Sequence, residues 1–207
     1  MAIAGRSPAA TFASLATAGF AWFVFAVLAM HVLRPDYEPA RHFLSDYAVG
    51  RFGGVMTSAF LALAAGCLGL ALGLLRAGPP AWPARAGAVL LLVAAAGLVV
   101  TARFETDLPG QPFTRSGDLH ELSFLVNVAS LMLAAVLLTL AFAADPRWRA
   151  HRPVAAALLA AVLVAFALQV RAIRSHGPVG LYNRAFAGLL VAWLLATALR
   201  LRTASRT

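Results

Sequence analysis

Side chains that could bind or activate a ligand occur near the ends of the long apolar stretches of this sequence. Ten of them are two histidines, three arginines, three aspartates, a serine and an asparagine: His31, Arg34, Asp36, Ser45, Asp46, Arg103, Asp107, His120, Asn127 and Arg171. Histidine exchanges protons near neutral pH and binds metals, and arginine binds anions through a planar fork of donors. We expect these ten side chains to form a ligand-binding pocket if the fold brings them to one membrane surface.

Metal chemistry is one possibility that these residue types allow. His31, His120 and His176 could bind Zn²⁺ and leave a position open for water, as in a hydrolase. An acid, Asp36 or Asp107, would complete such a site. The sequence contains no HExxH, HxH or CxxC motif, so each ligand would come from a different segment. Two histidines on different helices could instead be axial ligands of a haem. Zinc and haem are therefore both open as cofactors.

Anion binding is a second possibility. Arg34, Arg103 and Arg171 each stand at the end of an apolar stretch, and the alternation of the stretches places them at one level. Arginine forks bind phosphate and carboxylate with good geometry, and neighbouring acids can hold the arginines in place. These three residues predict a cradle for a lipid headgroup.

A short helix is expected along the membrane surface between Pro39 and Val49. Proline suits the first turn of a helix, and Gly50 suits its end. His42 and Asp46 would then be four residues apart and could touch. Ser45 adds a hydroxyl, so a serine-hydrolase arrangement is an alternative, although one helical turn is cramped for it.

His120 begins a polar stripe within an apolar stretch. Ser123 and Asn127 follow it at spacings of three and seven residues, on the same face of a helix. Polar groups are costly in hydrocarbon, so we expect His120 and Asn127 to point into the protein. Gln169 and Asn183 bring further polar groups to the same level from later segments.

The start of that helix is predicted from its capping residues. Asp118 is expected to be the N-cap, with Glu121 at the third helical position, as in a capping box. Both carboxylates would also favour the positive end of the helix dipole. Neither acid then needs a catalytic role.

The elements that must position these side chains are membrane helices. The 207 residues are 61% hydrophobic and only 12% charged, which no ordinary soluble surface shows. We predict an all-α, polytopic membrane bundle of six transmembrane helices with one short interfacial helix, forming a single domain over 1–207. The spans are expected at about 9–33, 54–75, 85–103, 119–144, 153–173 and 181–200.

The cysteine count and the charge exclude other classes of protein. Cys67 is the single cysteine, so an intramolecular disulfide framework is excluded. The net charge of +9 comes from arginines scattered between apolar stretches rather than from a continuous stripe, so we expect no nucleic-acid partner. Such arginines instead contact membrane lipids and fix orientation. A membrane-protein partner is possible, and the oligomeric state is open.

The two membrane surfaces differ in their acids. Alternating the spans places seven of the eight acids and four of the five histidines on one face, with nine arginines against eight on the two sides. The other face holds the arginine-dense segment Pro146 to Arg152 and the basic C-terminal tail. By the positive-inside rule we place both termini in the cytoplasm and the acidic face outside. The first apolar stretch, at 25 residues, is too long for a cleaved signal peptide.

Several segments together resemble a known family. They are His31-Val-Leu-Arg-Pro-Asp36, Leu44-Ser-Asp-Tyr-Ala-Val-Gly50, Phe104-Glu-Thr-Asp-Leu-Pro-Gly110 and Gly117-Asp-Leu-His120. Their order and placement resemble the family called domain of unknown function 998, over nearly the whole chain. The resemblance implies a prokaryotic protein of about six helices in the plasma membrane, with no established reaction.

Three functions are compatible with these patterns. We favour an extracytoplasmic polar pocket that binds a lipid headgroup or a small polar ligand. A metal-dependent membrane hydrolase that uses the histidines and acids is an alternative, and a structural or accessory membrane subunit without catalysis is another. Transport ranks last, because the span centres carry almost no polar groups.

Overall fold

Every long apolar stretch forms an α-helix, because a helix satisfies its own backbone hydrogen bonds where water is absent. The computed structural model describes residues 7–205. The long helices are α1 (Pro8–Leu33), α2 (Gly53–Ala77), α3 (Trp82–Arg103), α4 (Arg115–Ala141), α6 (Arg152–Arg174) and α7 (Val179–Ala204). All six are long and apolar enough to cross a membrane, which confirms the predicted all-α, multi-pass bundle and implies contact with lipid.

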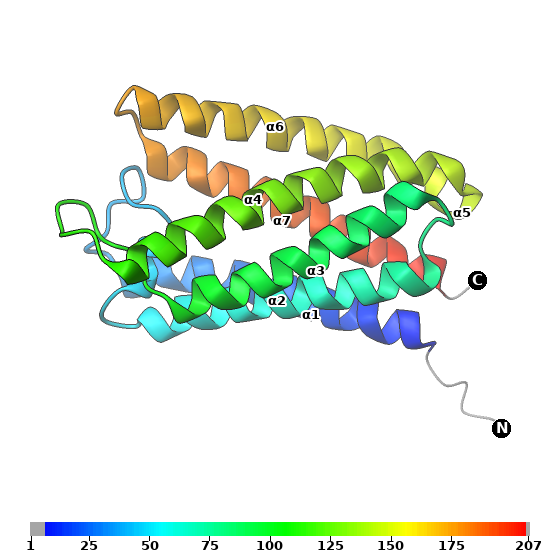
Figure 1. The fold of residues 1–207 in the computed structure, drawn as a ribbon, viewed down its shortest axis with the longest axis horizontal. Coiled ribbons are helices and arrows are strands. Elements are labelled where there is room, and N and C mark those ends of the chain that lie inside the picture. The colour runs from blue at the N-terminus through cyan, green and yellow to red at the C-terminus, as the bar shows by residue number, and fades with distance from the viewer. Residues whose placement is uncertain (1–6, 206–207) are drawn as a thin grey trace.

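The helices run alternately up and down, so the bundle has two ends (Figure 1). At the first, which we call the loop end, the connections 34–52, 104–114 and 175–178 emerge. The opposite end holds both described termini, the connection 78–81, the short helix α5 (Pro146–Arg149) and the 3₁₀ turn Phe142–Ala144. Successive connections therefore lie at alternate ends of the bundle, as predicted.

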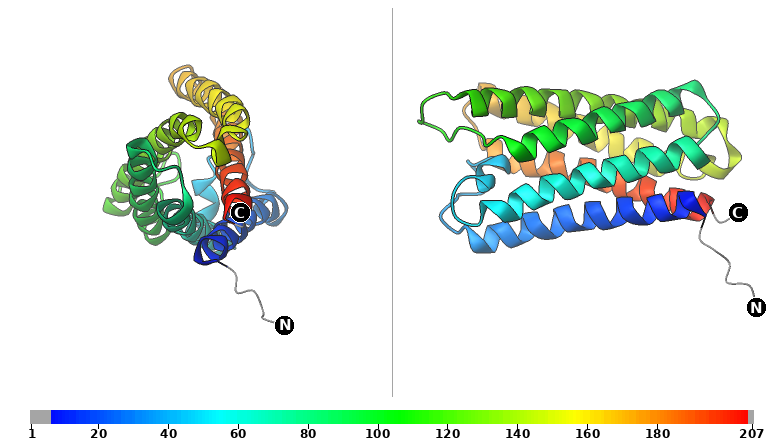
Figure 2. Two further views of the ribbon diagram at one scale, coloured as in Figure 1. Left: turned by 90° about the vertical axis from the view of Figure 1, so that its right-hand side faces the viewer. Right: turned by 60° about the horizontal axis from the view of Figure 1, so that its bottom comes forward.

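The six long helices form a ring that is unevenly closed. α1 packs against α2 and α7, α2 against α3, α3 against α4, and α6 against α7. Contact between α4 and α6 is sparser, and α6 lies on the outside of the bundle, as the end-on view in Figure 2 shows. Among the six spans, α2 is the most buried and α6 the least.

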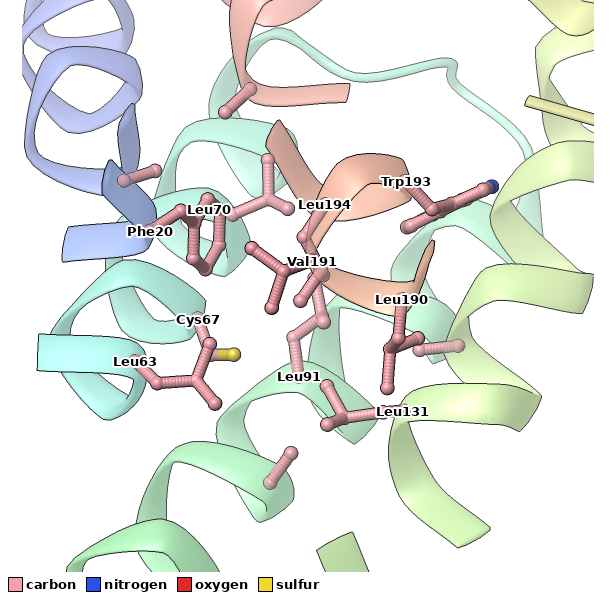
Figure 3. Close-up of a cluster of buried hydrophobic side chains, with 14 of the residues drawn as sticks. Phe20, Leu63, Cys67, Leu70, Leu91, Leu131, Leu190, Val191, Trp193 and Leu194 are labelled. Carbon is pink, nitrogen blue, oxygen red and sulfur yellow. The ribbon is translucent and has the colours of Figure 1, made fainter. Parts of the chain in front are cut away.

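Small residues and a shared apolar core hold the ring together. At Gly19 in α1, an added Cβ would stand 2.4 Å from the Ala62 carbonyl oxygen of α2, so only glycine permits this backbone approach. Side chains of five helices meet in the core shown in Figure 3. Phe20, Leu70 and Leu194 are each at most 1% exposed there.

The predicted interfacial helix is much shorter than expected. Between Pro39 and Val49 the chain forms turns and a single 3₁₀ turn, Ser45–Ala48. The Phe43 N–H donates to the Asp46 carboxylate at 3.0 Å, and the Leu44 N–H donates to Asn183 Oδ1 at 3.0 Å. Side-chain acceptors, one of them on α7, have replaced the carbonyl partners of a regular helix.

The start of α4 also differs from the prediction. The N-cap is Thr114, whose hydroxyl accepts the Gly117 N–H at 3.1 Å, and not Asp118. Asp107, from the preceding loop, accepts both the Thr114 N–H and the Thr114 hydroxyl at 2.8 Å. Asp118 therefore lies inside the first turn of α4. The N-cap position of Thr114 depends on Asp107, seven residues earlier in the preceding loop. The spacing of residues within α4 therefore could not predict this N-cap.

Candidate functional site

A cavity of about 430 Å³ lies inside the ring at the loop end. All six long helices and two of the loops contribute to its wall. Its mouth is lined by polar or exposed groups, namely Ser45, Asp107, Phe113, Asp118 and Glu121. Its floor is apolar and includes Leu63, Leu98, Leu131, Leu190 and Leu194. The lining thus changes from polar to apolar along the bundle axis.

The depth of the cavity follows from helix geometry. Asn183 lies four residues after the start of α7, and Leu194 lies fifteen residues after it. At about 1.5 Å per residue, these positions are roughly 6 Å and 22 Å from the loop end. The cavity therefore extends from the membrane surface to the apolar interior of the bundle.

Between mouth and floor, neutral polar side chains line the wall. Asn127 donates to the Thr101 hydroxyl at 3.0 Å, and that hydroxyl lies 2.8 Å from the Ser123 hydroxyl. His120 Nδ1 lies 2.8 Å from the Phe104 carbonyl oxygen. Because a carbonyl only accepts, Nδ1 carries the proton in this hydrogen bond. His120 and Asn127 point inward, as predicted for a polar stripe on a membrane helix.

Gln169 on α6 and Asn127 on α4 are the two amide-bearing wall residues whose side-chain oxygen has no hydrogen-bond partner within residues 7–205, and Gln169 is the more buried of the two. The Gln169 side chain is 2% exposed. It lies five residues before the end of α6, at about the depth of Asn183 on α7. A buried amide without a partner costs free energy, so its retention here requires an explanation.

The acids at the mouth are held differently from one another. Asp107 caps α4 through Thr114, and a Cβ on Gly117 would stand 2.0 Å from its carboxylate. Asp118 and Glu121 are exposed on the first turns of α4. Among the described residues, neither of these two carboxylates forms an ion pair. The mouth therefore carries two carboxylates that have no ion-pair partner in residues 7–205.

Arg34 holds the first long loop in place. Its guanidinium is buried, donates to the Val49 and Arg51 carbonyl oxygens at 2.8 and 3.1 Å, and lies 4.0 Å from the Tyr37 ring centroid. It also pairs with Asp36 at 2.8 Å, and this pairing lowers the pKa of that carboxyl. The donors of Arg34 are thus used within the loop.

Arg184, in the second turn of α7, fastens the same loop to two helices. It donates to His31 Nε2 on α1 at 2.8 Å, to the His42 carbonyl oxygen at 2.6 Å and to the Tyr47 hydroxyl at 3.2 Å. Since arginine only donates, His31 Nε2 must be unprotonated. His31 Nδ1 then donates to the Val27 carbonyl oxygen at 2.7 Å. His31 is therefore a neutral packing residue.

Asp46 is buried below the loop, at 2% exposure. It accepts the Phe43 N–H, and burial raises the pKa of its carboxyl. His42 instead stacks on Tyr37, and its Nδ1 lies 3.2 Å from the Glu38 carbonyl oxygen. The Ser45, His42 and Asp46 side chains therefore do not form the hydrogen-bonded chain of a serine hydrolase.

The three histidines proposed as zinc ligands occupy separate places. His31 contacts Arg184, His120 lines the cavity, and His176 is exposed with a left-handed backbone φ of 53°. Within residues 7–205, no group of three or more histidines, cysteines or acids is placed to hold a metal ion. His31 Nε2, the atom that an axial haem ligand would use, is taken by Arg184.

Four of the ten predicted site residues line the cavity: Ser45, Asp107, His120 and Asn127. Arg34, Asp36 and His31 stabilise the loop, and Asp46 is buried beneath it. Arg103 and Arg171 are exposed, and in the described chain no arginine lines the cavity. The predicted cradle of three arginines is therefore not assembled around it.

Several wall residues were not among those ten, including Thr101, Asp118 and Glu121. Two more carry amides, and one further residue holds the loop. Gln169 and Asn183 line the cavity, and Arg184 fastens the loop. An amide inside an otherwise apolar helix is the signal that points to Gln169 and Asn183. Arg184 gave no such signal, because an arginine near a helix end also suits the lipid headgroups.

Comparison with known proteins places the chain in one family. Residues 17–200 match the family model described as "Protein of unknown function (DUF998)". No curated protein and no solved structure is significantly similar to the chain. The chain therefore belongs to the DUF998 family, whose function is unknown.

Proposed function

We propose that the loop-end cavity binds a lipid-like amphiphile, with its polar end at the mouth and its hydrocarbon chain against the apolar floor. The observation that carries this proposal is the continuous change in lining, from Asp118 and Glu121 at the mouth to Leu131 and Leu194 at depth. The volume of about 430 Å³ is within the usual range of small-molecule pockets, roughly 300–1,000 Å³.

The sparse contact between α4 and α6 supports a membrane source for the ligand. Phe124 on α4 and Ile173 on α6 both line the cavity, Ile173 is 50% exposed, and α6 lies on the outside of the bundle (Figure 2). In a membrane, that outer surface faces lipid. An amphiphile could therefore enter between these two helices without crossing water.

We further propose that the loop end faces the outside of a prokaryotic plasma membrane, with both termini in the cytoplasm. The arginine-dense stretch around α5 supports this orientation by the positive-inside rule. Glu38→Cys and Arg149→Cys place exposed thiols at opposite ends, while the native Cys67 is buried. An impermeant maleimide added to intact cells should label the first variant and not the second; the reverse pattern would invert the orientation.

A cavity-filling pair of variants tests the binding function. Ala187 lines the cavity, whereas the next residue, Gly188, has open space around it. Ala187→Phe should therefore lose the lipid that co-purifies with the protein, while Gly188→Phe, a matched control, should keep it. Native mass spectrometry of protein extracted in mild detergent measures the bound lipid. Equal lipid content in both variants, or none in the unsubstituted protein, would reject the proposal.

A further inference from the structure

We infer that the amphiphile bound by this cavity carries a hydroxyl- or amine-bearing head without net negative charge, and that Gln169 accepts a hydrogen bond from it. This inference rests on the proposed binding function and adds the chemical class of the ligand. It differs from the phosphate cradle that the arginine positions alone suggested.

The charge of the wall is the first step. Three carboxylates line the mouth, those of Asp107, Asp118 and Glu121. Among residues 7–205, no arginine lines the cavity. The sequence contains no lysine. Proteins bind phosphate with arginine forks, lysines or clustered backbone N–H groups, and an anionic head here would instead meet like charges. A cationic or uncharged head meets no such repulsion.

The arginines nearest to the cavity form hydrogen bonds elsewhere or are absent from its lining. Arg34 and Arg184 donate to loop carbonyl oxygens and side chains, so neither can turn to the cavity without releasing the loop. Arg103 and Arg115 are exposed at the rim and do not line the cavity.

The hydrogen-bonding character of the wall is the second step. Gln169 Oε1 is an acceptor, is buried and has no partner in the part of the chain that the structure describes. Asn127 Oδ1, a second acceptor of the wall, is also buried and has no partner within residues 7–205. Buried acceptors are satisfied by donors, and a hydroxyl or an amine supplies one where a phosphodiester does not. The unpaired Oε1 atom of Gln169 and the carboxylates at the mouth thus both favour a hydroxyl- or amine-bearing head group without net negative charge.

Three probes with one oleyl chain and different heads test the inference: monooleoylglycerol, oleylamine and oleoyl lysophosphatidic acid. Binding to the detergent-purified full chain is followed by native mass spectrometry. We expect the glycerol and amine probes to bind at least about tenfold more tightly than the phosphate probe. Equal or tighter binding of the phosphate probe overturns the inference while leaving amphiphile binding intact. Failure of all three probes to bind rejects the proposed function itself.

Substitutions at one helix identify the acceptor. Gln169→Leu keeps the size of the side chain and removes the acceptor, so affinity for monooleoylglycerol should fall roughly tenfold, as expected for one buried hydrogen bond. Gln169→Glu keeps the acceptor, so oleylamine should bind at least as tightly as to the unsubstituted protein. Leu163→Val, on the lipid face of α6, is the control and should change neither affinity. Unchanged binding in Gln169→Leu, with its fold verified by thermal unfolding, overturns the role of Gln169.

Discussion

The two ends of the bundle are built in different ways. At the opposite end, stacked aromatic rings fill the interior: Phe142 lies 4.9 Å from Trp148 and 6.5 Å from Trp193, centroid to centroid. Both tryptophans are at most 1% exposed. At the loop end, arginines fasten a loop over a cavity whose wall holds two amide oxygens without partners in the described residues, those of Asn127 and Gln169. One end gains stability from close packing, whereas the other gives up packing for a cavity, as functional sites commonly do.

The largest effect should come from removing an aromatic ring at the packed end. Trp148→Ala deletes a fully buried ring that stacks on Phe142 and donates to the Ala77 carbonyl oxygen at 3.4 Å. The free energy of unfolding should fall by about 3–5 kcal/mol, the usual cost of such a cavity. Trp82→Ala, at the same end but 73% exposed, should cost less than about 0.5 kcal/mol. Thermal or denaturant unfolding in detergent measures both. Similar losses in the two variants would mean that this end is not packed as described.

A smaller effect is expected when the loop end loses its fastening. Arg184→Lys keeps the charge but cannot donate at once to His31, the His42 carbonyl oxygen and Tyr47. We expect a loss of about 2–3 kcal/mol and faster proteolysis within 34–52. Arg174→Lys, at an exposed site on the same end, should leave both unchanged. A loop equally resistant to protease in Arg184→Lys would show that α7 does not hold it.

The smallest effect should be a pH dependence of stability at the loop end. Burial raises the pKa of Asp46, so the native state binds its proton more tightly than the unfolded state does. Its contribution to stability therefore falls as pH rises above its ordinary pKa of about 3.9. The melting temperature of Asp46→Asn, relative to the unsubstituted protein, should rise between about pH 4 and pH 7.

Asp36→Asn is the matched control, because the pKa of Asp36 is shifted in the opposite direction to that of Asp46. The Arg34 guanidinium lowers the pKa of Asp36, so its stabilising contribution is present above its ordinary pKa and is lost as pH falls. The relative melting temperature of Asp36→Asn should accordingly decrease as pH rises toward about 4 and then stay nearly level up to about pH 7. Parallel slopes for the two variants would contradict the difference in environment between these carboxyls.

The six long helices could be predicted from the sequence, whereas the cap of α4 and most contacts of the polar residues could not. Hydropathy located six spans, and the spacing of His120 and Asn127 predicted that both face inward. Arg34 was expected to bind a ligand, but its acceptors are carbonyl oxygens fifteen and seventeen residues away, whose positions depend on the folded loop. The short helix at Ser45–Ala48 was overestimated for the same reason, since Leu44 bonds to α7.

The sequence by itself determined that this chain forms six helices long and apolar enough to cross a membrane, and which connections share a side. In lipid every backbone group must be satisfied locally, so apolar length alone dictates helices and their alternation. Only the tertiary structure decided which polar groups serve the protein and which remain available. Arginine and aspartate side chains find partners far along the chain, and Gln169 is left with an unused acceptor because α6 packs mainly against α7.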